Sequence, residues 1–203
     1  MTKKAVDVVL LPDEHVTDVA IEANGALVAG GNTEIILNRN DYLPHISLAM
    51  GTLHDRDLPA VATVLEDIAR TVRLPRLCVF GVSITCSGSG KLISSLLIQK
   101  TAGLQALHER VLRELQTWLG TDATAEMFYD PAEVAESSLS WVKNYKKQSS
   151  YEMFFPHITL GYGRVTDVPL PIEFTPTSLA VCHLGNHCTC REVLASIDLD
   201  RKQ

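Results

Sequence analysis

The sequence has few of the features that mark secreted or membrane-inserted proteins. It has no C-x-x-C pair, and its five cysteines, an odd number, fit reduced thiols better than a disulfide framework. It has no apolar run long enough to span a bilayer, and no basic, apolar leader at the N-terminus. We therefore expect a cytoplasmic protein that does not bind a membrane.

Positive charge is also scarce. The 203 residues include 18 Lys and Arg against 24 Asp and Glu, so the net charge is −6. A protein that coats long nucleic acid draws its affinity mainly from cationic side chains that meet phosphates. The charge argues against binding to long duplexes, but a small nucleotide or an RNA end stays open as a partner.

What the chain does have is a hydrophobic content of 46%, enough to bury one core. We expect a monomer with a single domain over residues 1–203. Helix and strand patterns are mixed without strict β-α-β alternation, which predicts an α+β fold with largely antiparallel sheets. Predicted strands lie at 5–11, 33–37, 76–86 and 91–99, and residues 178–199 are predicted to form two strands around a turn at Gly185 and Asn186. Predicted helices begin at Asp13, near Asp57, at 102 and at Asp130.

Several boundaries follow from turn and cap residues. The turn at 38–41 should join the strand at 33–37 to a strand at 44–51 as a hairpin. The residues SGSG at 87–90 should join the strands at 76–86 and 91–99. The second helix should end before Pro75, and the third should run over 102–119 with Gly120 as its cap. A further helix is predicted over 130–147, with Asp130 and Pro131 at its start.

One peptide occurs twice. PHISLAMG at 44–51 returns as PHITLGYG at 156–163, and the likeness includes polar positions that a generic strand pattern does not explain. On a strand, residues i and i+2 point to the same face, so each copy presents an imidazole beside a hydroxyl. A symmetric arrangement of the two halves would bring both pairs into one cleft: His45 with Ser47, and His157 with Thr159.

Two imidazoles suit acid–base chemistry near neutral pH, because one can accept a proton while the other donates one. Cleavage of a phosphodiester needs both transfers, one from the attacking oxygen and one to the leaving oxygen. The hydroxyls of Ser47 and Thr159 can donate hydrogen bonds to the non-bridging phosphoryl oxygens. This scheme requires no metal ion and no cofactor.

The two H-x-[ST] tetrapeptides, His45 to Leu48 and His157 to Leu160, resemble the paired signature of the 2H (two-histidine) phosphoesterase superfamily. That superfamily includes bacterial RNA 2′,5′-ligase-like proteins and plant and fungal cyclic nucleotide phosphodiesterases. The resemblance implies a bilobal α+β fold with pseudo-twofold symmetry, outer helices and a central cleft. It also implies metal-free hydrolysis of a 2′,3′-cyclic phosphate or a 2′,5′-linked nucleotide, with catalytic His45 and His157 and phosphate contacts from Ser47 and Thr159.

Two features depart from that pattern. The two histidines lie far apart for the family, and we assign the extra length to a helical insertion at 121–155. Many ligase-like relatives place an arginine directly after the second motif, whereas here Gly161, Tyr162 and Gly163 come before Arg164. Tyr162 and Arg164 are candidate contacts to a base or a phosphate, or ordinary surface residues.

Other interpretations stay open at this point. The cleft could bind a nucleotide or RNA without catalysis. The segment 182–190 could hold zinc through Cys182, His183, His187, Cys188 and Cys190, although a β-hairpin with core-facing cysteines fits its spacing better. The segment SGSGK at 87–91 does not match a phosphate-binding loop.

The segment WVKNYKK at 141–147 could capture RNA through stacking and phosphate attraction. Helical geometry favours a plainer arrangement, with Val134, Trp141 and Tyr145 packed inward and the lysines in solvent. Those lysines are Lys143, Lys146 and Lys147.

Overall fold

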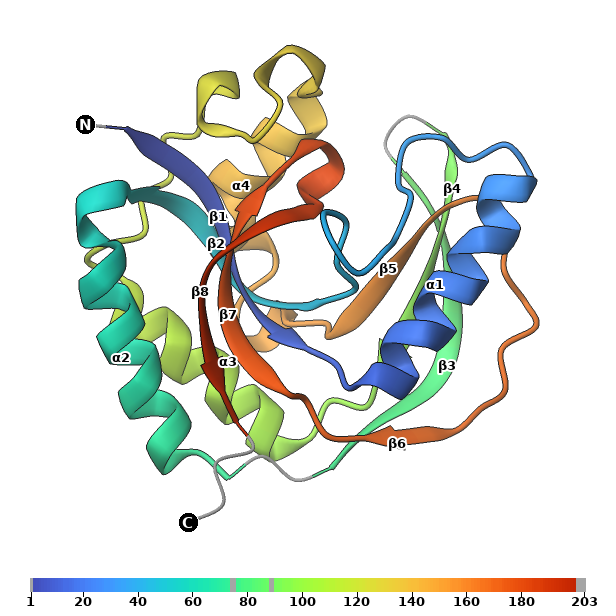
Figure 1. Ribbon diagram of the computed structural model, residues 1–203, viewed down its shortest axis with the longest axis horizontal. Helices are drawn as coiled ribbons and strands as arrows, with labels where there is room; N and C mark the ends of the chain where they lie inside the picture. Colours follow the sequence, from blue (N-terminus) through green and yellow to red (C-terminus); the bar gives the residue numbers. More distant parts are fainter. Residues whose placement is uncertain (1, 74–75, 88–89, 200–203) are drawn as a thin grey trace.

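The computed structural model describes residues 2–73, 76–87 and 90–199 and has an α+β fold of two lobes (Figure 1). Each lobe is built on a four-stranded antiparallel sheet, with the strand orders β2-β1-β7-β8 and β5-β4-β3-β6. The strands of the first sheet are β1 (Lys3–Leu11), β2 (Ile46–His54), β7 (Ser178–Leu184) and β8 (Cys190–Asp198). Those of the second are β3 (Leu77–Cys86), β4 (Leu92–Ile98), β5 (His157–Tyr162) and β6 (Ile172–Phe174).

Four α-helices are found in the described residues: α1 (Glu14–Ala29), α2 (Leu58–Thr71), α3 (Ala102–Leu115) and α4 (Glu136–Gln148). Helix α1 follows β1 of the first sheet but packs against β5 and β6 of the second. Helix α3 follows β4 of the second sheet but packs against β2 of the first, beside α2. In each lobe, therefore, the sheet packs against a helix that follows a strand of the other sheet.

The two halves repeat one unit, β1-α1-β2 and β4-α3-β5. In the first, Val9 pairs with Ser47; in the second, Ser95 pairs with Thr159. Both ladders then skip one residue, so a β-bulge falls at Leu48 in one copy and at Leu160 in the other. The repeated peptides thus occupy equivalent positions on the edge strands β2 and β5, which contact each other.

The carbonyl group at each bulge is satisfied by a buried polar side chain from the helix that crosses over. His108 Nδ1 of α3 donates to the Leu48 carbonyl at 2.7 Å, and Asn24 Nδ2 of α1 donates to the Leu160 carbonyl at 2.6 Å. A bulge disrupts the ladder locally, and a buried carbonyl without a partner is costly. These two contacts hold both motif strands in the same bent shape.

The predicted strand at 33–37 is wrong, and so is the predicted hairpin with the first repeat. Residues 33–37 form no strand, and β2 pairs with β1 instead. Two buried asparagines take over the hydrogen bonds that a ladder would supply, because Asn24 and Asn32 both donate to the Ile35 carbonyl and Asn24 Oδ1 accepts from Leu37 N. The side-chain bonds therefore favour an irregular path.

Two helix boundaries also differ from prediction. Helix α3 ends at Leu115, and Gly120 does not cap it but exchanges two hydrogen bonds with Thr52 of β2. Helix α4 begins at Glu136 rather than at Asp130, which instead forms an ion pair with Arg191 at 3.0 Å. The tertiary contacts outweigh the local capping signals in both places.

The other predicted elements are confirmed. Asp13 caps α1 by accepting from Val16 N, and the strands around the turn at Gly185 are β7 and β8. Helix α2 ends at Thr71, while Pro75 lies outside the described residues. Strands β3 and β4 pair as expected, but residues 88–89 of the predicted hairpin connection lie outside the described residues.

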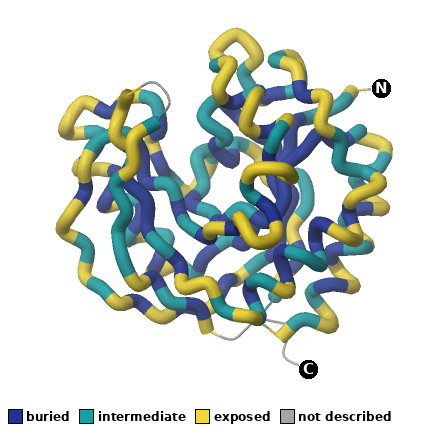
Figure 2. The backbone as a smooth tube through the Cα atoms, turned by 180° about the vertical axis from the view of Figure 1, so that it is seen from behind, coloured by how far each residue is buried: buried dark blue, intermediate teal, exposed yellow. Residues whose placement is uncertain are grey.

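Burial is uneven among the strands. Strands β1, β2 and β7 are mostly buried, whereas β3 and β8 carry many half-buried and exposed residues. Figure 2 shows exposed residues on the outer turns of the helices and loops. Across residues 2–73, 76–87 and 90–199, no helix combines the length and apolar character needed to cross a membrane.

Candidate active site

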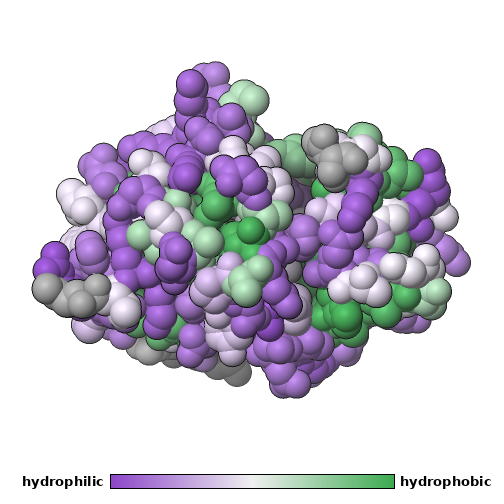
Figure 3. Space-filling model, turned by 90° about the horizontal axis from the view of Figure 1, so that it is seen from above, coloured by the Kyte–Doolittle hydropathy of each residue, from purple (hydrophilic) through white to green (hydrophobic). Residues whose placement is uncertain are grey.

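A cavity of about 670 Å³ is lined by both copies of the repeat. His45 and Ser47 reach it from the first copy, and His157 and Thr159 from the second. The predicted meeting of the two pairs is therefore present in the structure. Its remaining walls come from α4, the segment before β2, strands β3 and β4, and the turn between β7 and β8. Viewed from above, the surface is mostly hydrophilic, with hydrophobic residues gathered near its middle and again toward the right-hand side of the view (Figure 3).

The two imidazoles are held in the same way. His45 Nδ1 donates to the Leu43 carbonyl at 2.7 Å, and His157 Nδ1 donates to the Phe155 carbonyl at 2.8 Å. A carbonyl can only accept, so Nδ1 carries the hydrogen and Nε2 keeps its lone pair in the neutral ring. In each copy a buried proline lies between that carbonyl and the histidine, which gives the shared Pro-His dipeptide a structural purpose.

Both histidines are easier to deprotonate than an exposed imidazole. Burial lowers the pKa of His45 to about 4, with a further decrease from the charge of His157, while the bond to Leu43 opposes the change. Burial also lowers the pKa of His157, and the bond to Phe155 again opposes it. Both rings are therefore neutral at pH 7 when the cavity holds no anion.

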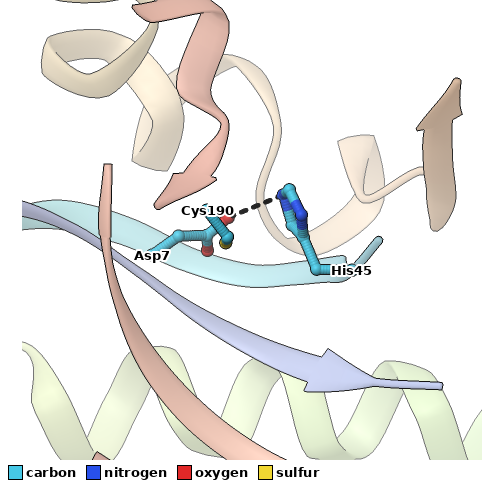
Figure 4. A group of neighbouring side chains, drawn as sticks. All are labelled: Asp7, His45 and Cys190. Atoms are coloured by element: carbon cyan, nitrogen blue, oxygen red, sulfur yellow. Dashed lines mark ion pairs between the residues drawn. The ribbon is translucent and has the colours of Figure 1, made fainter. Parts of the chain in front are cut away.

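The first half-site contains a buried carboxyl group. Asp7 of β1 is fully buried, and its Oδ2 accepts from Ser47 Oγ at 2.6 Å and lies 3.8 Å from His45 Nε2 (Figure 4). Burial raises the pKa of Asp7 well above its usual value, and the Ser47 hydroxyl opposes that change. A protonated Asp7 can donate to Ser47, which frees the Ser47 hydrogen for an anion in the cavity.

The second half-site differs at the equivalent positions. Strand pairing aligns Ile93 with Asp7, so no carboxyl group lies beside Thr159 on that strand. Instead, Ser83, Ser95 and Thr159 come from three adjacent paired strands and all line the cavity. This row of hydroxyls can hydrogen-bond the oxygens of a phosphate or a sugar.

Tyr162 and Arg164 have different surroundings. Tyr162 lines the cavity, and its hydroxyl lies 3.1 Å from His187 Nδ1, while Lys91 lies over its ring at 5.2 Å from the centroid. Arg164 is exposed and lies outside the lining of this cavity. Of the two candidate contacts, only Tyr162 is placed at the cavity.

The alternative site at 182–190 does not form as a single metal-binding group. His183 Nε2 bonds to the Met127 carbonyl, and His187 contacts Tyr162 and Glu34. Cys182 and Cys190 are buried in the first lobe, as a core-facing hairpin predicts. Among the described residues, Cys190 instead lies within reach of Asp7 and His45.

Helix α4 agrees in part with its predicted orientation. Tyr145 is buried, and Lys143, Lys146 and Lys147 are exposed. Trp141, however, is 44% exposed and lines the cavity together with exposed Met153 and Phe155. The Trp141 ring, which is predicted to pack inward, therefore forms part of the cavity wall.

The sequence did not single out Ser83 and Ser95, which line the cavity, or Asp7, which is buried beside Ser47, and it offered His187 only as a possible zinc ligand. Asp7 had a signal, because it is the single charged residue in the apolar run 5–11. A charged residue is rarely fully buried without a specific role or partner. The serines gave no such signal, since their positions depend on pairing between strands far apart in the sequence.

No protein-family model matches the chain, and a comparison with curated proteins finds no match. Solved structures do match it over nearly its whole length. TT0787 of Thermus thermophilus is 16% identical with a TM-score of 0.57, covering 98% of this chain and 100% of that one. E. coli LigT in its apo form is 12% identical with a TM-score of 0.53, covering 98% of each chain.

A second LigT structure, in complex with 3′-AMP, is 13% identical with a TM-score of 0.51 and covers 99% of this chain and 100% of that one. At such low identity the likeness concerns the fold. It agrees with the expectation drawn from the two H-x-[ST] motifs, since both lead to one two-lobed architecture. The chain therefore has the bilobal α+β fold that its resemblance to the 2H phosphoesterases predicted, and it shares that fold with E. coli LigT.

Proposed function

We propose that this protein is a 2H-type phosphoesterase that hydrolyses a 2′,3′-cyclic phosphate or a 2′,5′-linked nucleotide without a metal ion. One observation carries the proposal. Two neutral imidazoles, each fixed through Nδ1 by the carbonyl two residues before it, line one cavity with both Nε2 atoms available. Such a pair can take a proton from one oxygen and give a proton to another in the same reaction.

The proposal assigns different roles to the two histidines. In the protein without substrate, His45 is the better candidate for the base. Its pKa of about 4 keeps the ring unprotonated over a wide pH range. The pKa of His157 is also lowered, but a bound phosphate anion favours the imidazolium form and supplies the acid with its proton. His45 then takes a proton from the attacking water, and His157 protonates the leaving ribose oxygen.

The hydroxyl groups hold the phosphoryl oxygens in this scheme. In the first half-site Ser47 donates to the phosphoryl group, and the hydrogen bond between Ser47 and Asp7 positions the Ser47 hydroxyl. Thr159 donates from the second half-site, next to Ser95 and Ser83. A hydrogen bond to an anionic oxygen is worth about 1.5–3 kcal/mol, so each contact contributes to the rate without being indispensable.

The cavity also has room and surfaces for a nucleoside. Tyr162, Trp141 and Phe155 present aromatic rings to it, and base stacking on an aromatic ring is worth roughly 1–3 kcal/mol. The LigT structure with 3′-AMP shows that a protein of this fold can hold a nucleotide. Both points support a nucleotide or an RNA end as the substrate.

The proposal includes an insertion at residues 121–155. The repeat unit provides an internal measure, because residues 30–45 join α1 to β2, whereas residues 116–156 join α3 to β5. The longer connection contains α4, which packs against β2 and adds Trp141 and Tyr145 to the cavity wall. We propose that the insertion restricts which substrates the cavity can bind.

The test is a substrate panel. The purified protein is incubated with 2′,3′-cyclic mononucleotides, 2′,5′- and 3′,5′-dinucleotides and ADP-ribose cyclic phosphate, with and without EDTA. We expect turnover of a cyclic phosphate or a 2′,5′-linkage that EDTA does not reduce. Activity lost in EDTA and restored by a divalent ion contradicts the mechanism. Nucleotide binding without turnover on any substrate favours the alternative, a non-catalytic nucleotide- or RNA-binding module.

A further inference from the structure

Three possible metal ligands meet at the inner end of the first half-site. Asp7 lies on β1, His45 directly precedes β2, and Cys190 begins β8 (Figure 4). One ligand atom from each side chain lies within 4.8 Å of the other two. The sequence separation is large, so neither a spacing motif nor the predicted hairpin site at 182–190 reveals this group.

The distances suit a small transition-metal ion. Bonds of about 2.0–2.3 Å from Zn²⁺ to nitrogen, oxygen and sulfur place tetrahedral ligands about 3.3–3.8 Å apart. His45 Nε2 and Asp7 Oδ2 are 3.8 Å apart, and no separation within the group exceeds 4.8 Å, so the ligand atoms would need to approach one another by at most about 1 to 1.5 Å. A set of one nitrogen, one oxygen and one sulfur ligand favours zinc-like ions over Mg²⁺ or Ca²⁺.

A second observation points to a missing partner for Asp7. Its Oδ1 is buried and has no hydrogen-bond partner among the described residues, and the whole residue is 0% exposed. Buried polar atoms without partners are uncommon in folded proteins and cost free energy. A metal ion beside this carboxyl group would supply the positive charge that stabilises its ionised form.

The charges also balance. Coordination by a carboxylate, a thiolate and a neutral imidazole would release one proton from Asp7 and one from Cys190 into solvent. A divalent ion would then leave a buried complex with no net charge.

We propose that Asp7, His45 and Cys190 bind a zinc-type divalent ion, and that the bound ion inhibits the protein by occupying His45 Nε2. His45 and Asp7 supply the nitrogen and oxygen ligands and Cys190 supplies the thiolate, and of these three residues His45 also lines the cavity. The inhibition rests on the proposed function, because it removes the lone pair that His45 uses as a base. The binding itself does not depend on that function.

The binding test uses Co²⁺, whose bond to a thiolate gives a charge-transfer absorption band in the near ultraviolet. The full-length protein, stripped of metal, is titrated with Co²⁺, and Zn²⁺ is then added as a competitor. We expect the band in the wild-type protein and its loss in Cys190→Ser. Cys78→Ser is the matched control, because Cys78 lies on β3 of the other sheet, and it should keep the band.

Asp7→Asn keeps the shape of the site and tests it without removing a core thiol. It should keep the band and weaken Co²⁺ binding by about tenfold or more. Circular dichroism checks that each variant is folded. A wild-type protein without the band overturns the proposal, and so does a band that persists in folded Cys190→Ser.

A separate arm measures turnover of the best substrate in the presence of Zn²⁺. We expect Zn²⁺ to inhibit the wild type and Cys78→Ser, and to inhibit Cys190→Ser at least about tenfold less strongly. Turnover that Zn²⁺ leaves unchanged, in a protein that shows the cobalt band, refutes the inhibition but leaves the phosphoesterase proposal intact. A cobalt band in a protein that turns over no substrate refutes the phosphoesterase proposal and supports the metal site.

Discussion

The two half-sites share a backbone but differ in what surrounds it. Both present Pro-His, a carbonyl that fixes the imidazole, and a bulge bonded to the opposite helix. The first half-site is closed in by Asp7 and Cys190, which are fully buried. The second opens onto the hydroxyls of Ser83 and Ser95.

This difference gives the two half-sites different chemical properties. A sealed, apolar environment shifts pKa values, which suits a group that exchanges protons. An open row of hydroxyls offers several hydrogen bonds, which suits a surface that binds and orients a substrate. One repeated backbone unit therefore offers two different chemical environments, and the neighbouring strands decide which environment surrounds each histidine.

Removing either imidazole should have the largest effect, and an equal one in both halves. His45→Ala and His157→Ala should each lower turnover by roughly 10²–10⁴, with little change in substrate binding, because each deletes a proton-transfer partner. The double variant should lose less than the product of the two single losses. His15→Ala, at an exposed histidine on α1, serves as the control.

If one histidine variant stays folded and keeps near-wild-type turnover, the two half-sites are not equivalent in catalysis and the two-histidine mechanism is wrong. The measurement is steady-state kinetics on the best substrate, with circular dichroism to confirm folding.

The hydroxyl variants should separate activity from stability. Ser47→Ala and Thr159→Ala should each lower turnover by roughly one to two decades, since each removes one hydrogen bond to an anionic oxygen. Only Ser47→Ala also removes the partner of buried Asp7, so it should reduce the free energy of unfolding by about 1–3 kcal/mol. Urea unfolding of both variants checks this, and equal stability losses would contradict the proposed asymmetry.

The pH dependence of kcat/KM should reflect the different pKa values of His45 and His157. We expect a bell-shaped profile with its optimum on the acid side of neutral. The acid limb reflects His45, whose pKa is about 4, and the alkaline limb reflects His157, whose pKa is lowered from 6.5. Beyond each limb the rate should change by about tenfold per pH unit, and the two values belong to the pair. A rate that rises steadily toward alkaline pH, with chemistry limiting, contradicts this mechanism.

The helix contacts at the two bulges should respond differently to acid. Burial lowers the pKa of His108 to about 4, below the value near 6.5 of an unfolded histidine, so the unfolded state binds more protons between these values. The stability that His108 contributes is therefore present above about pH 6.5 and is lost as pH falls toward 4, at up to about 1.4 kcal/mol per pH unit.

His108→Gln should flatten this part of the curve of unfolding free energy against pH, whereas Asn24→Leu should lower stability at every pH without changing the slope. Chemical unfolding at several pH values measures both. An unchanged slope in His108→Gln would show that other groups cause the acid sensitivity.

The smallest effect should come from the hydroxyl row. Ser95→Ala should raise KM by a few-fold and leave kcat nearly unchanged, because a neutral hydrogen bond contributes about 0.5–1.5 kcal/mol. Its counterpart in the first half is Val9, which pairs with Ser47 as Ser95 pairs with Thr159. Val9→Ala is the matched control and should leave KM unchanged. If both substitutions raise KM equally, the row is not a binding surface.

The sequence predicted the elements that depend on local pattern. The repeated peptides identified four residues that meet in one cavity, because both copies carry a histidine and a hydroxyl residue at matching positions. It could not identify Cys190 or Ser95 as neighbours, since their places are set by register between distant strands. The false strand at 33–37 has the same origin, because the asparagine bonds that replace its ladder come from tertiary packing.

The position of β1 between β2 and β7 has a consequence for how the chain assembles. A growing chain can pair β1 with β2 once residue 54 is made and β3 with β4 once residue 98 is made, whereas β7 and β8 come near the end of the sequence. The strand that carries Asp7 waits for residues 178–184 before both its edges are covered. Pairings of such high contact order slow folding and leave one edge of β1 uncovered until β7 is made. The half-site that is most sealed in the finished protein is therefore the last to close during synthesis.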